Sequence, residues 1–303
     1  MLKMPEIIKI DHMTKDYGKG RGIFDFNFSI NEGEIFGLVG TNGSGKTTTL
    51  RHLMGFLAPD SGSCEIGGLN CRKNSAEIMK KVGYVPGEID FPDVGSGTTF
   101  LKIQAQYLGI TDMKYTEELI DRFKIDTSAP LKRMSKGMKQ KMALVAAFMA
   151  KPQILLLDEP STGLDPLMRD TLIELILEHK KRGATVLMSS HIFKELEDTC
   201  DRVTFIHNGK MIDTVDRGMY DPNMPKLYRI GFAKEAEYQE FIRKAEFQIE
   251  RSNDKYMHAL VTVPMPEMNR LIRQLAGYDM RYIRYIPYSL EMYYTKVIEK
   301  GGN

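Results

Sequence analysis

The 303-residue sequence has no tryptophan and only three cysteines, Cys64, Cys71 and Cys200. They form neither a Cys-x-x-Cys pair nor an even set, which predicts structural thiols in a reducing cytosol rather than a disulfide framework. The sequence also lacks any run of about 18 apolar residues, and the longest stretch, ALVAAFMA, has the length of a buried helix. The N-terminus shows no apolar segment followed by a small-residue cleavage site. We therefore expect a chain that does not cross a membrane by itself.

A strong excess of either charge is missing too. The 42 Lys and Arg residues nearly balance the 40 Asp and Glu residues, leaving a net charge of +2. This balance gives no global attraction to nucleic acids or acidic membranes. With 42% hydrophobic and 27% charged residues, the composition is that of a globular protein with a real core. At this length we expect one large and one small domain.

Strand-like and helix-like patterns alternate through the first two thirds of the chain. Apolar runs at 34–40, 154–158 and 184–190 predict buried strands, and helical periodicity fills roughly 97–125 and 167–181. The alternation of Phe24, Phe26, Phe28 and Ile30 instead indicates a half-exposed antiparallel strand. Strands that alternate with helices of this length predict an α/β fold with a largely parallel sheet and helices on both faces.

The pattern changes near residue 222. The segment YDPNMP at 220–225 has two prolines and no periodicity, as is typical of a linker. After it, the order β-α-β-β-α-β followed by a tail helix at about 289–299 predicts a small α+β domain of ferredoxin-like arrangement. We therefore divide the chain into domains at 1–221 and 222–303.

A glycine-rich segment, GTNGSGKT at 40–47, stands between a buried strand and a helix. It matches the phosphate-binding pattern G-x-x-x-x-G-K-[ST]. The glycines let the backbone curl so that N–H groups point at a phosphate, and the helix N-terminus adds partial positive charge. Lys46 can reach the β- and γ-phosphates, and the Thr47 hydroxyl is placed to ligate Mg²⁺. The residues expected to bind the nucleotide here are Gly40, Thr41, Asn42, Gly43, Ser44, Gly45, Lys46, Thr47 and Thr48.

A second motif completes such a site. The buried strand ILLLDEP ends in two carboxylates. Asp158 can hold Mg²⁺ directly or through water. Glu159 can orient and deprotonate an attacking water. Together the two motifs predict binding of ATP with Mg²⁺, with Lys46 and Glu159 in catalytic roles.

These residues resemble the ATP-binding subunits of ABC transporters over about residues 5–220. MSKGM at 134–138 stands where the family carries its signature, STGLD at 161–165 matches the D-loop, and SSH ends a strand at His191. The resemblance implies a P-loop NTPase fold of ABC-ATPase type, a mixed sheet with a helical subdomain. It implies nucleotide contacts by Ser135 and Gly137, stacking of Tyr17 on adenine, and a catalytic role for His191. It also places Asp165 at subunit contacts near the attacking water.

One position departs from the family. The glutamine that contacts Mg²⁺ and communicates with the membrane partner should follow GYVP, but the sequence has Gly87 and then Glu88 there. Glycine has no side chain to ligate a metal. Either Glu88 takes over, or the contact is absent and communication passes through neighbouring residues.

The resemblance also implies partners. In the family the signature of one subunit faces the phosphate loop of another, so two chains are expected to meet head to tail as a two-fold pair with two ATP sites. MSKGMKQK and the C-terminal extension look most like bacterial ABC-2-type exporters of drugs, antimicrobial peptides or ions. We expect separate transmembrane permease subunits, which would hold the chain at the cytoplasmic face of the membrane.

Other functions fit the sequence less well. Soluble ABC ATPases that act on ribosomes usually carry two ATPase units in tandem, whereas this chain has one set of motifs. Relatives in DNA repair insert long coiled coils, and no such heptad run occurs. Glu159 and His191 argue against a non-hydrolysing regulatory module. A ferredoxin-like domain can also bind RNA, but residues 227–303 have a net charge of only +2 and no RNP aromatic motif. We expect no nucleic-acid partner.

Overall fold

The computed structural model describes residues 5–216, 225–286 and 289–301. The chain forms two compact units, Met1–Arg217 and Gly218–Asn303. The boundary predicted at 221/222 lies outside the described residues. Within the described residues, no helix is both long enough and apolar enough to span a membrane.

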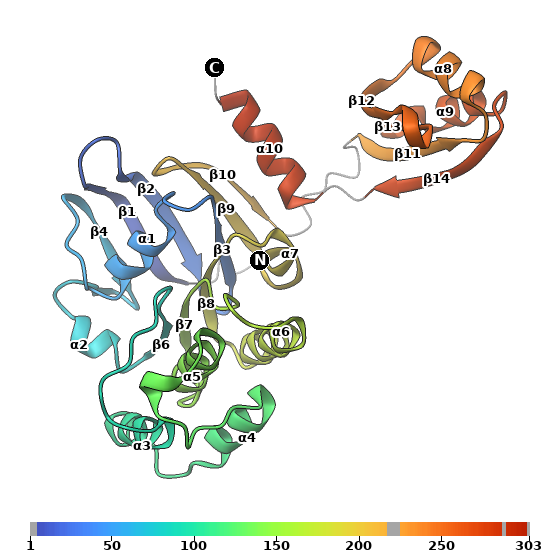
Figure 1. The fold of residues 1–303 in the computed structure, drawn as a ribbon. Coiled ribbons are helices and arrows are strands. Elements are labelled where there is room, and N and C mark those ends of the chain that lie inside the picture. Colours follow the sequence, from blue (N-terminus) through green and yellow to red (C-terminus); the bar gives the residue numbers. More distant parts are fainter. Residues whose placement is uncertain (1–4, 217–224, 287–288, 302–303) are drawn as a thin grey trace. The chain divides into compact units, whose positions relative to one another are not determined.

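The N-terminal unit is built on a six-stranded sheet with the order β10-β9-β3-β8-β7-β6 (Figure 1). Neighbouring strands are parallel except for β9 and β10. All residues of β3, β7 and β8 are buried, which explains why these strands are continuous apolar runs in the sequence. The strands are β3 (Ile35–Val39), β6 (Val82–Val85), β7 (Ile154–Asp158), β8 (Thr185–Ser190), β9 (Arg202–His207) and β10 (Lys210–Asp216).

A second, antiparallel sheet has the order β2-β1-β4-β5. The predicted antiparallel strand at 24–30 is confirmed as part of β2, which pairs with β1. The hairpin of β4 and β5 has no counterpart in the sequence expectations, because its segment SGSCEIGGLN has few apolar residues and four polar ones. The strands are β1 (Glu6–Asp16), β2 (Gly22–Asn31), β4 (Ser61–Ile66) and β5 (Leu69–Asn70).

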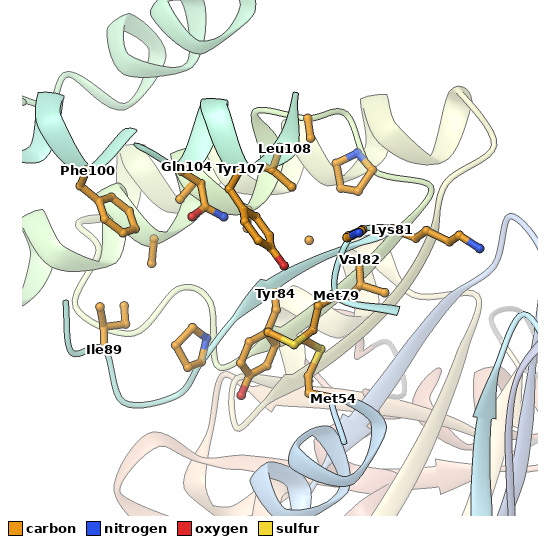
Figure 2. Close-up of a pocket in the computed structure, with 18 of the residues that line it drawn as sticks. Met54, Met79, Lys81, Val82, Tyr84, Ile89, Phe100, Gln104, Tyr107 and Leu108 are labelled. Atoms are coloured by element: carbon orange, nitrogen blue, oxygen red, sulfur yellow. The ribbon is translucent and has the colours of Figure 1, made fainter. Parts of the chain in front are cut away.

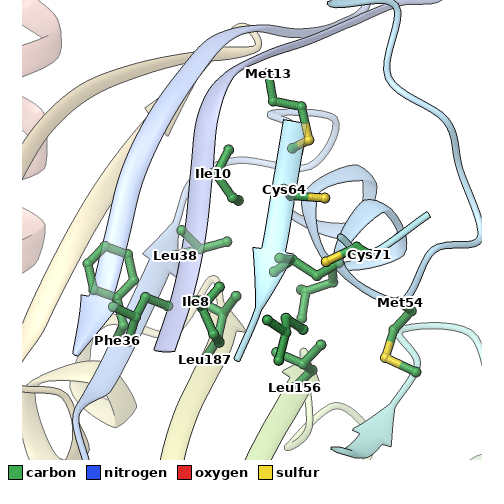
Figure 3. Packing of buried hydrophobic residues seen from close by; sticks show 14 of the residues in the cluster. Ile8, Ile10, Met13, Phe36, Leu38, Met54, Cys64, Cys71, Leu156 and Leu187 are labelled. Carbon is green, nitrogen blue, oxygen red and sulfur yellow. The ribbon is translucent and has the colours of Figure 1, made fainter. Parts of the chain in front are cut away.

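The main core lies between these two sheets, around α1 (Lys46–Leu53). This helix contacts β7 of one sheet and β4 of the other. Figure 3 shows Leu38, Leu156 and Leu187 of the six-stranded sheet facing Ile8 and Ile10 of β1. Burial of about 20 such side chains, at roughly 1.5–3 kcal/mol each, fixes the start of α1 relative to the strand ends.

Most of the remaining helices follow the expected positions. The helical region predicted at 97–125 is two helices, because Gly109, with φ of 71°, ends the first one in the left-handed conformation. Together with α5 they form the helical subdomain (Figure 1). The helices of this unit are α1, α2 (Ser75–Ile78), α3 (Gly97–Leu108), α4 (Lys114–Phe123), a 3₁₀ turn at Leu131–Arg133, α5 (Lys136–Phe148), α6 (Pro166–Lys181) and α7 (Phe193–Thr199).

The C-terminal unit has the element order β-α-β-β-α-β and one antiparallel sheet with the order β12-β13-β11-β14. This is the ferredoxin-like arrangement. One face of the sheet packs on both helices through a core that includes Phe232, Phe241 and Leu271. The elements are β11 (Lys226–Phe232), α8 (Glu235–Lys244), β12 (Gln248–Asn253), a 3₁₀ turn at Asp254–Tyr256, β13 (His258–Val263), a 3₁₀ turn at Met265–Glu267, α9 (Met268–Leu275), β14 (Met280–Ile286) and α10 (Leu290–Gly301).

Candidate nucleotide site

The glycine-rich segment forms a tight loop between β3 and α1. Gly43 and Gly45 have φ of 82° and 114°, a region that only glycine adopts readily. A side chain at Gly40 would place its Cβ 2.3 Å from the carbonyl oxygen of Ile206. The sequence therefore needs glycine at these three places for the backbone N–H groups to curl around an anion at the start of α1.

Lys46 lies inside this loop with only 5% of its surface exposed. Its Nζ donates to the carbonyl oxygens of Gly40 at 2.8 Å and Thr41 at 3.3 Å. The same Nζ is 3.4 Å from Oε1 of Glu159. The structure thus brings the two motifs of the predicted site together through one ammonium group.

Asp158 is completely buried at the end of β7. Its Oδ1 accepts a 2.6 Å hydrogen bond from Ser189 Oγ, whereas its buried Oδ2 has no hydrogen-bond partner among the described residues. A Cβ built on Gly87 would lie 2.8 Å from that Oδ2. A buried carboxylate oxygen without a donor suits a hard divalent cation, so the donor set of Asp158 and Thr47 fits Mg²⁺.

Glu159 occupies a strained backbone conformation with φ of 47°. Its N–H donates to Ser189 Oγ at 2.9 Å, which holds the residue at the end of β7. Its Oε2 lies 3.1 Å from Nδ1 of His191. The Glu159 side chain is 22% exposed, so its carboxylate is open to the cavity while Lys46 and His191 contact it from two sides. This geometry is suited to a general base that must receive a proton from water.

Lys46 and Glu159 line one open cavity of about 840 Å³, and Asp158 lies buried directly before Glu159 in the chain. This volume is large enough for a nucleotide-sized ligand. Of the predicted residues, the cavity is lined by Tyr17, Asn42, Gly43, Ser44, Gly45, Lys46, Thr47, Thr48 and Glu159. Gly40 and Thr41 contribute through their carbonyl groups on Lys46, and His191 through its contact with Glu159.

Two cations in this cavity were missed by the sequence analysis. Arg21 and Arg51 line it together with Glu88. Arg51 follows Lys46 by five residues on α1, and Arg21 follows Tyr17 by four residues. This closeness to residues already predicted to bind the nucleotide is the sequence feature that indicates them. The cations favour an anionic ligand such as a polyphosphate.

Ser135, Gly137 and Asp165 do not line this cavity either. Ser135 caps α5 by accepting from the Met138 N–H, and Asp165 caps α6 by accepting from the Met168 N–H. Gly137 lies against the D-loop, where an added Cβ would be 2.8 Å from the carbonyl oxygen of Gly163. Ser135 and Asp165 are both exposed. They therefore lie at the surface of the unit rather than in its own phosphate site.

A buried carboxylate that the sequence analysis missed connects the loops of Glu159 and His191. Glu195 on α7 is 3% exposed, and its Oε2 accepts from Ser161 Oγ at 2.8 Å and from Ser190 Oγ at 3.0 Å. Its Oε1 lies 3.2 Å from Nε of Arg169. Ser161 follows the Glu159 segment and Ser190 directly precedes His191, so Glu195 holds both loops. The role of Glu195 depends on loops that meet only in the fold, so no short sequence motif marks its position.

Comparisons with known proteins bear on this arrangement. The profile of the family described as ABC transporter matches residues 23–162. The chain is 35% identical over 218 residues to the bacitracin transport ATP-binding protein BcrA of Bacillus licheniformis, with 70% of each chain covered. It belongs to the ABC transporter ATPases.

Solved structures agree with this assignment. A structure of an ATP-binding subunit of an ABC transporter is 29% identical, has a TM-score of 0.64 and covers 69% of this chain and 90% of its own. A dimeric ATP-binding cassette bound to ADP and Pi shares the fold at 20% identity, with a TM-score of 0.62 and coverage of 70% and 99%. The predicted ABC-ATPase fold and family membership are therefore confirmed.

Proposed function

We propose that this ABC ATPase binds ATP with Mg²⁺ in the cavity described above and uses Glu159 as the general base for hydrolysis. The observation that carries the proposal is the position of its carboxylate, 3.4 Å from the Lys46 ammonium and 3.1 Å from His191 Nδ1. Lys46 and the loop of residues 40–48 hold the phosphates, and Tyr17 contacts the base. Mg²⁺, held by Thr47 and Asp158, supplies charge neutralisation for the phosphates.

The second part of the proposal is head-to-tail pairing of two copies. Ser135, Gly137 and Asp165 do not line the cavity of their own unit, and Ser135 and Asp165 are exposed. A Ser hydroxyl at a helix start is suited to a phosphate. We assign these residues to the nucleotide bound by the partner copy. Closure on ATP and opening after hydrolysis would then follow the γ-phosphate contacts.

A groove of about 500 Å³ on the same unit supports a membrane partner. Figure 2 shows Tyr107 and Leu108 of α3 across the groove from Met79 and Tyr84. Tyr107 is 58% exposed, so the groove offers uncovered aromatic surface to a partner. The groove is lined on one side by Pro86, and the next residue, Gly87, lines the nucleotide cavity.

We assign this groove to an apolar segment of an ABC-2-type permease subunit. The permease would hold the ATPase at the cytoplasmic face of the membrane, and movement of residues 86–88 would report the state of the nucleotide. The name of BcrA, a bacitracin transport protein, supports export of a drug or peptide as the driven process. In this scheme residues 1–221 form the ATPase domain and residues 222–303 an accessory domain.

The test begins with Glu159→Gln. It should bind Mg-ATP as the wild type does, hydrolyse it at least about 10²-fold more slowly, and run as a dimer on gel filtration with ATP. Hydrolysis at a near-normal rate would refute the role of Glu159.

The pairing is tested in the same background. Adding Ser135→Arg should return Glu159→Gln to a monomer, because a bulky cation would block the facing phosphate loop. The matched control is Thr111→Arg, which puts the same side chain at an exposed position of the helical subdomain. ATP-dependent dimers in both double variants would show that Ser135 makes no contact across the pair.

A further inference from the structure

One face of the C-terminal sheet is not used by its core. Ile230 on β11 and Ala259, Val261 and Val263 on β13 all point to the helix-covered side. Because side chains alternate along a strand, Arg229 and Leu260 lie on the opposite, open face. Residues that pair directly across strands share a face, so the register of the sheet assigns the open face residue by residue.

Three arginines form a row across this open face. The register pairs Arg251 of β12 with Leu260 of β13, Leu260 with Arg229 of β11, and Arg229 with Arg284 of β14. Neighbouring strands are about 4.8 Å apart, so the row spans the sheet at about that spacing per strand. We name Arg251, Arg229 and Arg284 the arginine row.

The arginine row is unfavourable for folding by itself. Arg229 and Arg284 stand directly opposite each other, and like charges in that arrangement destabilise a sheet. Within the described residues, none of the three forms an ion pair. Glu250 is the carboxylate next to the row, and its Oε1 accepts from Thr262 Oγ1 at 2.6 Å instead. A local arrangement that opposes stability points to a function.

The neighbouring rows hold no lysine or arginine, and Glu250 contacts one of them through Thr262. On one side the register places Thr262 beside Leu227 and Ile286. On the other side it places His258 beside Gly231 and Tyr282, whose ring lies over Gly231 at 2.5 Å from where a Cβ would stand. Leu227 is buried, so the aromatic and apolar surface that borders the arginine row is that of Tyr282, which is 41% exposed, and of the half-buried Ile286.

We propose that this open face docks an acidic protein segment that also carries apolar side chains. Guanidinium groups match carboxylates in bidentate geometry, and the bordering rows accept aliphatic and aromatic contacts. RNA is disfavoured because RNA-binding sheets stack bases on aromatic side chains of their central strands. Here the open-face positions of the central strands β11 and β13 hold His258 as their only ring. A second copy is disfavoured because its face would set arginine against arginine.

The experiment measures binding of a labelled peptide to the full chain by fluorescence anisotropy. The probe is a 12-residue peptide of Glu and Leu in low salt, about 50 mM, where surface charges are less screened. One variant replaces the arginine row with alanine. The charge-matched control replaces Arg243, Lys244 and Arg273, on the helices that cover the other face, with alanine.

The row variant should bind the peptide at least about tenfold more weakly, and the control within about twofold of the wild type. Arg284→Ala alone should leave the melting temperature unchanged or raise it, which a purely structural arginine would not do. ATP hydrolysis should be unchanged in all of them, so this test is independent of the proposed function. The proposal is overturned by equal losses in row variant and control, by no peptide binding to the wild type, or by tighter binding of polyuridylate RNA or phosphatidylglycerol vesicles than of the peptide.

Discussion

The Nζ of Lys46 lies 3.4 Å from Oε1 of Glu159, and the two residues come from different loops at the same edge of the six-stranded sheet. In the structure this ammonium group also satisfies the carbonyl oxygens of Gly40 and Thr41. Lys46 is therefore held in the loop by backbone groups, close to where phosphates would be bound.

Replacing Lys46 by alanine should weaken nucleotide binding by at least about tenfold, because the charge aimed at the phosphates is lost. Equilibrium titration with a fluorescent ATP analogue measures this directly. Arg21→Ala, which removes another cation that lines the same cavity, serves as the comparison and should weaken binding less. A Lys46→Ala variant that keeps wild-type affinity would place the phosphates elsewhere.

Glu195→Gln should lower the turnover number of ATP hydrolysis while changing KM little. The carboxylate holds Ser161 and Ser190, which flank the loops of Glu159 and His191, and does not line the nucleotide cavity. We expect a loss of about five- to fiftyfold, as for residues that position catalytic groups. Glu195→Ala should lose more than Glu195→Gln, which can still accept from the serines. An unchanged turnover number in a folded Glu195→Ala variant would contradict the positioning role.

Much of the site follows from the sequence because its motifs are local. Residues 40–47 and the end of the strand at Asp158 are each marked by a short sequence motif. The strands before them, β3 and β7, are continuous apolar runs, which predicts that both lie inside one parallel sheet and end at the same side of it. Glu195 could not be found in this way, since its partners are 34 and 5 residues distant and meet it only in the fold. The hairpin of β4 and β5 escaped for another reason: its packing against β1, rather than its own propensity, makes it a strand.

Glu88 tests the departure from the family pattern. It lines the nucleotide cavity, and its neighbour Gly87 lies against the carboxylate of Asp158. If Glu88 takes over the metal contact of the missing glutamine, Glu88→Ala should raise the Mg²⁺ concentration for half-maximal hydrolysis by about three- to tenfold. Glu88→Gln should need less Mg²⁺ than Glu88→Ala for half-maximal hydrolysis, because its amide oxygen can still contact the metal. A superimposable Mg²⁺ titration for Glu88→Ala would limit this residue to communication with the groove.

Stability should fall on mild acidification because of His179. Burial lowers the pKa of this imidazole, which packs on Phe148 at 4.9 Å and lies 3.0 Å from the carbonyl oxygen of Leu175. The unfolded chain takes up the proton near the ordinary pKa of about 6.5, while the folded chain resists it, so stability is full above that pH and is lost below it.

His179→Phe should remove part of the difference in melting temperature between about pH 7.5 and pH 5.5. The remaining part of this difference is expected from His52, whose pKa is also lowered by burial. His12→Asn is the control at an exposed histidine, whose pKa is raised by its hydrogen bond to Asp25, and should leave the acid loss in place. Equal acid sensitivity of His179→Phe and wild type would assign the loss to other groups.

A fragment ending at Asp221 should keep ATP binding and hydrolysis within about tenfold of the full chain. The residues that line the nucleotide cavity all precede residue 160, and the chain forms separate compact units on either side of residues 217/218. The C-terminal unit has a core of its own, so its removal leaves no partner strand missing from the six-stranded sheet. Contacts between such units usually shift equilibria by about 1–3 kcal/mol rather than create a catalytic site.

Turnover and ATP affinity of the fragment are measured after gel filtration, because apolar surface exposed by the truncation can cause aggregation that mimics lost activity. A soluble, monodisperse fragment of residues 1–221 that binds no ATP would show that the accessory domain completes the nucleotide site.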